Sequence, residues 1–141
     1  MILYFLHGIV TWLLTGLIWT IQWVHYPFFK FANLNPNAFI YHQQRISVLV
    51  VPLMLFELIT GLILLIRDGQ IFPIINLINI SLIILIWLHT FLIMVRIHRA
   101  LDHAPSLTLI QQLVHQNWVR TMAWSLKAIL WGGAIWHLIS I

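Results

Sequence analysis

Residues 46–66 read ISVLVVPLMLFELITGLILLI, an apolar run with a single charged side chain, that of Glu57. A helix needs about 20 mostly apolar residues to cross the hydrocarbon core of a bilayer, and this run is long enough. Similar runs occupy about 2–25, 72–95 and 118–140. We therefore predict an all-α fold, an integral membrane four-helix bundle that forms a single transmembrane domain over residues 1–141.

The composition of the chain agrees with insertion into a membrane. Apolar residues make up 62% of the sequence and charged residues 7%, and the mean hydropathy is +0.97, whereas a soluble domain carries about 25% charged residues. Cysteine is absent, which excludes disulfides and thiolate chemistry. The net charge of +4 is small and scattered, so we expect no nucleic-acid partner.

Signals at the helix ends extend two of the predicted helices beyond the bilayer. Asn35 is a favourable N-cap and Pro36 a favourable first residue, so the second helix is expected to begin there. The sequence RDG at 67–69 should end this helix, and Pro73 should begin the third. The fourth helix is expected to begin near Ser106 and to continue into its span.

The basic residues predict the orientation of the bundle. The loops after the first and third spans lie on one side of the membrane, and that side carries Lys30, Arg45, Arg96, Arg99 and Arg120. The other side has only Arg67, next to Asp68. By the positive-inside rule, the basic side faces the cytoplasm, so both termini are predicted on the non-cytoplasmic side.

Three titratable side chains lie in the central or cytoplasmic part of the predicted spans, and a charge at the bilayer centre costs about 2.5–3.5 kcal/mol. At a rise of about 1.5 Å per residue, Glu57 lies roughly 18 Å into its span, and Lys127 and His89 lie roughly 10 Å from the cytoplasmic edge. Helical spacing aligns further polar and aromatic residues into two faces. These are Asn117, Arg120, Trp124, Lys127 and Trp131 on the fourth helix, and Gly8, Trp12, Thr15, Trp19, Gln22 and Tyr26 on the first.

We interpret these faces as the walls of a cavity open towards the cytoplasmic side, which would bind a flat lipophilic or quinoid molecule. The candidate catalytic residues are Glu57, His89, Arg120, Asn117 and Lys127, and the candidate substrate-lining residues are Trp19, Gln22, His25, Tyr26, Trp124 and Trp131. Glu57 and His89 would handle protons, and Lys127 would set the charge of Glu57. Arg120 with Asn117 would stabilise a developing oxyanion.

A structural role is the alternative for the same charges. Glu57 would then pair with Lys127, or with His89, only to hold the four helices together. We predict no metal site, because a metal needs three or four convergent ligands and the helix depths place His25 well away from Glu57.

Two histidines on different helices are candidate haem ligands. His7 and His137 both lie near the outer face, and two histidines at matched depth could ligate a haem axially. Two unconnected interfacial histidines are the alternative.

Three short motifs resemble a known group of proteins. WVHYPFF at 23–29, RISVLVVPLM at 45–54 and HQNWVRTMAW at 115–124 resemble small four-helix bacterial membrane proteins that are similar to the anthrone-oxygenase-like group. The matching positions are Pro27, Pro52, and Asn117 with Arg120. The resemblance covers the whole chain in topology but only these motifs in sequence. It implies a bacterial inner-membrane protein that oxidises or oxygenates a polycyclic phenolic or quinoid substrate, without an established cofactor.

A second resemblance concerns the first helix. LHGIVTW at 6–12 is similar to the start of the four-helix membrane protoporphyrinogen oxidase that binds haem, which would make His7 a haem ligand. The third helix opens INLINISL at 75–82 and lacks the basic residue that this family has there.

Together these observations predict a multi-pass protein of the bacterial inner membrane that is oxidoreductase-like or oxygenase-like and binds a flat lipophilic or quinoid molecule. The alternatives are a haem-b-binding oxidase-like protein and a non-catalytic subunit of a larger membrane complex. The expected partners are the lipid bilayer, a lipophilic small molecule, and further copies or subunits.

Overall fold

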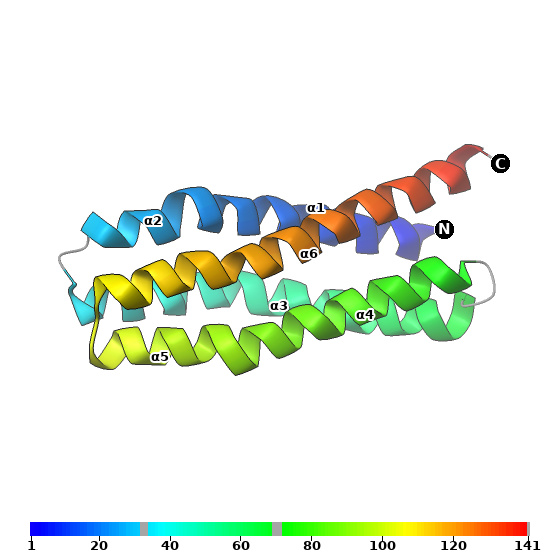
Figure 1. Cartoon of the computed structure of the whole chain (residues 1–141). Coiled ribbons are helices and arrows are strands. Elements are labelled where there is room, and N and C mark those ends of the chain that lie inside the picture. The colour runs from blue at the N-terminus through cyan, green and yellow to red at the C-terminus, as the bar shows by residue number, and fades with distance from the viewer. Residues whose placement is uncertain (32–33, 69–71, 141) are drawn as a thin grey trace.

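The computed structural model describes residues 1–31, 34–68 and 72–140. Four helical rods lie side by side, each antiparallel to the next along the chain (Figure 1). The rods are α1 (Ile2–Thr20) with η1 (Ile21–His25), α2 (Tyr26–Phe28) and η2 (Phe29–Phe31); α3 (Pro36–Asp68); α4 (Pro73–His89) with η3 (Thr90–Met94) and α5 (Val95–His103); and α6 (Leu107–Ser140). Strands are absent from the described residues, and the predicted all-α, four-helix architecture is confirmed.

Three of the rods are long and apolar enough to cross a membrane: Ile2–Phe31, Pro36–Asp68 and Pro73–His103. These rods contain three of the four predicted spans. α6 is not among them, and its buried face carries Asn117, Arg120 and Lys127 in addition to apolar side chains. The expected span at 118–140 therefore stays a prediction.

The helix ends follow the local signals in the sequence. The Asn35 side chain accepts a hydrogen bond from the Asn37 backbone at 3.0 Å, and α3 begins at Pro36. α3 ends at Asp68 as expected, while Gly69 lies outside the described residues. At the start of α6, the Ser106 hydroxyl accepts a hydrogen bond from the Leu109 backbone at 3.2 Å. The prediction of helix ends from capping residues is thus confirmed at these positions.

The first and third rods contain short π-helical segments that the sequence did not predict. A π turn inserts one extra residue into an α-helix, so side chains on its two sides no longer follow one helical spacing. An unbroken α-helix would place His89 and Arg96, seven residues apart, on one face. Because η3 lies between them, the structure instead buries His89 and exposes Arg96.

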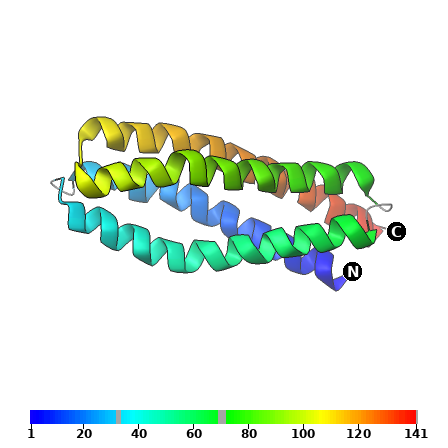
Figure 2. The ribbon, with the colours of Figure 1, turned by 90° about the horizontal axis from the view of Figure 1, so that it is seen from below.

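The start of α1 and the end of α6 lie at the same end of the bundle, together with the end of α3 and the start of α4 (Figures 1 and 2). The end of η2, the start of α3 and the connection from α5 to α6 lie at the opposite end. The structure therefore agrees with the prediction that the two termini share one side. The loop charges remain the basis for assigning that side as non-cytoplasmic.

The buried interior consists of two apolar clusters with polar residues between them. The cluster near the termini contains Tyr4, Leu64, Trp131 and Ile135. The larger cluster includes Leu14, Ile18, Met54, Ile86 and Trp124. On α1, α3 and α6, the residues buried between these clusters are two glycines and five polar residues: His7, Thr11, Glu57, Thr60 and Lys127. This polar layer is the first of two regions in which predicted site residues lie.

Candidate functional site

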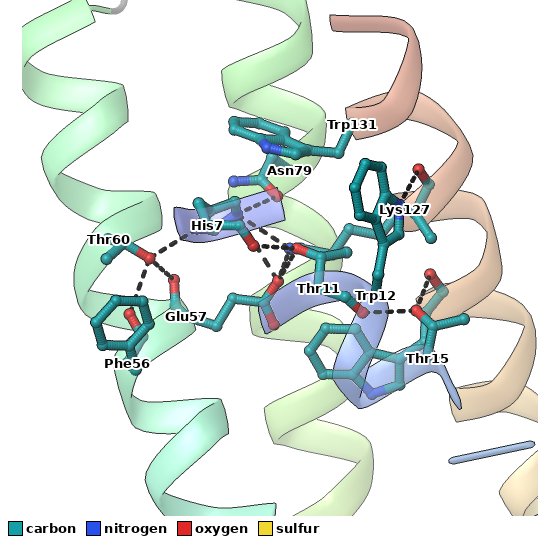
Figure 3. A network of polar contacts seen from close by, with 12 residues as sticks. His7, Thr11, Trp12, Thr15, Phe56, Glu57, Thr60, Asn79, Lys127 and Trp131 are labelled. Carbon is teal, nitrogen blue, oxygen red and sulfur yellow. Dashed lines mark hydrogen bonds and ion pairs between the residues drawn. The ribbon is translucent and has the colours of Figure 1, made fainter. Parts of the chain in front are cut away.

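The predicted site residues separate into two regions: a closed network around Glu57 and Lys127, and a cavity beside Arg120. In the first, the Lys127 ammonium of α6 forms an ion pair with the Glu57 carboxylate of α3 (Figure 3). Each of the two side chains is only 1% exposed. The predicted pairing of Glu57 with Lys127 is therefore confirmed.

α1 contributes Thr11 and His7 to this network (Figure 3). Thr11 donates a hydrogen bond to the Glu57 carboxylate and accepts one from Lys127 Nζ at 3.0 Å. Lys127 Nζ also lies 3.2 Å from His7 Nε2. The ion pair between α3 and α6 is thus also in contact with two side chains of α1.

His7 lies inside the network. Its Nδ1 is 2.7 Å from the Thr60 hydroxyl and its Nε2 is 3.3 Å from Asn79 Oδ1. The ring of Trp131 covers His7, with the centroids 4.5 Å apart. Because both ring nitrogens contact protein side chains, neither is left for an iron.

His137, the proposed second haem ligand, is exposed and packs its ring 5.8 Å from that of Phe72. The structure does not join His7 and His137 into an axial pair, and these residues do not fit a haem. Depth alone suggested the pair, and the side-chain contacts of His7 separate it from His137.

The second region centres on Arg120 of α6. Its guanidinium is buried, with the residue 6% exposed, and its Nη1 donates a hydrogen bond to Asn117 Oδ1 at 3.3 Å. Asn117 in turn donates to Gln22 Oε1 at 2.8 Å, and Gln22 donates to the Val114 carbonyl at 3.1 Å. Arg120 Nε has no hydrogen-bond partner among the described residues.

A cavity of about 240 Å³ lies beside Arg120, between α3 and the third rod. Tyr26 and His98 reach it together with Arg120, and the Tyr26 hydroxyl lies 3.1 Å from His98 Nε2. Its other walls are mainly apolar and include Ile46, Val50, Met54, Trp87, Phe91 and Met94.

Both π segments contribute to the walls of the cavity, through Ile21 of η1 and through Thr90, Phe91 and Met94 of η3. Such segments occur frequently at functional sites, because the extra residue reshapes the helix surface. The cavity beside Arg120 is therefore the stronger candidate site of the two regions.

The expected tryptophan walls lie elsewhere. Trp19 packs against Trp23 and Trp118, and its Nε1 donates to the Ser125 hydroxyl at 3.0 Å. Trp124 is buried in the larger apolar cluster, and Trp131 lies over His7. The predicted face of the first helix is directed at α6: the Trp12 indole donates to the Ala128 carbonyl at 3.2 Å. Apart from Tyr26, this face packs against α6 and does not line the cavity.

The remaining predicted residues also lie apart from Glu57. His89 Nε2 is 3.3 Å from Gln116 Oε1. The ring of His25 lies 5.2 Å from that of His42. Among the described residues, no group of three or more histidines, cysteines or acids could hold a metal ion. Of the thirteen predicted site residues, only Tyr26 and Arg120 line the cavity.

His98 is a cavity residue that the sequence reasoning did not identify. The third rod continues to His103 and buries Met94, His98 and Leu101 at helical spacing. That spacing in the sequence could have shown that His98 faces inwards. In the closed network, the sequence reasoning did not identify Thr11, Thr60 and Asn79, because it selected residues by their charge and these three side chains are neutral.

No protein-family model, curated protein or solved structure matches the chain.

Proposed function

We propose that this chain is a multi-pass membrane protein that binds a flat lipophilic, quinoid molecule in the cavity beside Arg120. The observation that carries the proposal is a buried guanidinium that lines a cavity with mainly apolar walls. Ligand sites of small molecules combine such walls with a few convergent polar groups. α6 crosses the bilayer with the other three rods, both termini face away from the cytoplasm, and the membrane is the bacterial inner membrane.

The size and position of the cavity support a ring-shaped head group. Its volume of about 240 Å³ is smaller than the roughly 300–1,000 Å³ of sites that enclose a whole drug-sized ligand. Trp87 and Phe91 offer aromatic contacts for a flat ring. Val51 and Phe91 are also exposed on the outer surface of the bundle. A hydrocarbon tail would therefore stay among the lipids while the ring enters between α3 and η3.

Arg120, Tyr26 and His98 supply the polar end of the site. Arg120 would donate hydrogen bonds to a ring oxygen and stabilise negative charge on it. The Tyr26 hydroxyl and the His98 ring, which already contact each other, would exchange a proton with that oxygen. These are the roles that an oxidoreductase-like reaction of a quinoid ring requires from the protein. Glu57 and Lys127 would hold the rods together rather than touch the ligand.

Binding of a short-chain quinone to the purified protein in lipid nanodiscs tests the proposal, with quenching of tryptophan fluorescence as the signal. We expect saturable binding to the wild type that weakens at least about tenfold in Arg120→Gln, as for the loss of a charged hydrogen-bond donor. Arg96→Gln, which removes an exposed arginine at the same end of the bundle, is the matched control and should bind like the wild type.

Circular dichroism and size-exclusion profiles should be the same for all three proteins. Absence of saturable binding to the wild type, or equal losses in the two variants, would contradict the proposal. A Soret absorption band in the purified protein would favour a haem protein instead.

A further inference from the structure

The acidic residues of the chain leave no carboxylate for Arg120. The chain contains three acidic residues. Glu57 pairs with Lys127, and Asp68 pairs with Arg67 at 2.6 Å at the other end of α3. Asp102 lies on α5 and forms no ion pair among the described residues. Arg120 likewise has no ion pair there, although it is one of the most buried charged side chains of the bundle.

The guanidinium nevertheless keeps its charge, because arginine does not lose its proton in proteins. Its hydrogen-bond partners are two neutral groups, the amide of Asn117 and the hydroxyl of Tyr26. Its Nε has no partner among the described residues. A buried charge is strongly unfavourable unless it is paired. Arg120 is therefore a buried cation whose donors are only partly used.

The side chains that face the cavity from the other elements do not supply a negative charge. Tyr26 comes from α2, Gln43 and Ser47 from α3, Thr90 from η3 and His98 from α5. Each of these is neutral or, in the case of histidine, becomes positive on protonation. The polar end of the cavity is thus positive or neutral throughout.

We infer that the ligand supplies the missing negative charge, so that the cavity selects lipophilic molecules with an ionised oxygen. Such an oxygen can belong to an acidic hydroxyl on a quinoid ring or to the carboxylate of an acyl chain. The inference rests on the proposed binding function of this cavity and adds the charge of the ligand to it. Paired with Arg120, the oxyanion would use the free guanidinium donors, and the hydrocarbon part would meet the apolar walls.

Matched pairs of ligands test the inference on the wild-type protein in nanodiscs. The first pair is a 3-alkyl-2-hydroxy-1,4-naphthoquinone, ionised at neutral pH, and its O-methyl ether, which cannot ionise. The second pair is dodecanoate and dodecanol. Within each pair that binds, we expect the dissociation constant of the ionised ligand to be at least about tenfold lower than that of the neutral ligand. Charge pairing with a buried arginine implies this difference. Whichever ionised member binds more tightly identifies the source of the oxyanion.

Two Arg120 variants connect the preference to this side chain. Arg120→Gln should remove the difference between ionised and neutral ligands, and Arg120→Lys should retain part of it. Equal affinity of the wild type for both members of each pair would overturn the inference while leaving the proposed binding function intact. If no member of either pair binds, the proposed function itself fails.

Discussion

Two charged residues of α6, Lys127 and Arg120, are buried about two helical turns apart and differ in everything that surrounds them. Lys127 meets a carboxylate, a hydroxyl and an imidazole in a closed layer. Arg120 meets one amide, one neutral hydroxyl and a cavity. Lys127 is paired with an opposite charge and connects two helices, whereas Arg120 lies beside a cavity and has no counter-ion among the described residues.

The difference originates on α3, the helix that lies opposite both residues. Beside Lys127 it presents Glu57 and Thr60. One to three turns earlier it presents Ser47, Val50 and Met54 to the cavity. Since α3 supplies an acid at only one of the two levels, α6 carries a paired charge at that level and an unpaired one at the other.

Lys127→Met should give the largest loss of stability. It leaves the Glu57 carboxylate buried without a cation, which costs about 3–5 kcal/mol for a broken buried pair. Reversible unfolding in mixed micelles, followed by circular dichroism, measures the change. The double variant Glu57→Gln with Lys127→Met should recover most of the loss, and Lys30→Met, at an exposed lysine, should have no effect. A loss no larger than that of Lys30→Met would mean that the pair contributes nothing.

Gly8→Ala should give the next largest loss, because α1 and α6 approach closely beside the closed network. A Cβ at position 8 would lie 2.6 Å from Ile135 Cδ1 and 2.9 Å from Trp131 Cδ1. Overpacking of this kind costs about 1–3 kcal/mol, measured by the same unfolding experiment. Gly16→Ala is the control, since no atom lies within 4 Å of the added carbon there. Equal stability of the two variants would show that α6 shifts freely away from α1.

Thr60→Val should have a smaller effect, through the 2.7 Å contact of its hydroxyl with His7. Hydrogen bonds between membrane helices contribute about 0.6–1.7 kcal/mol, so the free energy of unfolding should fall within that range. Thr20→Val is the control, since the Thr20 hydroxyl bonds only to the Gly16 carbonyl of its own helix. A drop as large as that of Lys127→Met would mean that the imidazole is as important as the ion pair.

Arg120→Met should change the stability of the ligand-free protein least. It removes a buried charge that has no counter-ion, so the free energy of unfolding should stay within about 1 kcal/mol of the wild type or rise. The comparison between the two regions fails if this variant unfolds as easily as Lys127→Met, because Arg120 would then have a stabilising partner.

The sequence predicted the architecture well because the relevant signals are local. Apolar runs of membrane length, the Asn35 cap and the Ser106 cap each act within a few residues. The Glu57–Lys127 pair was also predictable, since the two are the charged residues deepest in the predicted spans. The fold and one of the two polar regions therefore follow from patterns along single helices.

The candidate site was predicted less completely because it depends on contacts between helices. The sequence reasoning expected one cavity that contains both Glu57 and Arg120, whereas the structure puts the cavity beside Arg120 and surrounds Glu57 with protein side chains. The π segment η3 has the sequence TFLIM, which would be apolar with or without the extra residue. The hydropathy of the sequence therefore does not reveal a π segment. The mutual placement of His7, Thr60 and Asn79 likewise depends on three different rods.

The π segments also have a consequence for the length of the chain. Each of η1 and η3 contains one extra residue compared with a regular α-helix. A regular α-helix that lacked this residue would keep the helices on either side in the same orientation. Deletion of Leu92, an exposed residue of η3, would therefore return the third rod to an unbroken α-helix with α4 and α5 still facing their neighbours. The bundle would keep its packing and lose the bulged wall of the cavity. A relative that has no such cavity should align with this chain through a single-residue gap in each of the two segments.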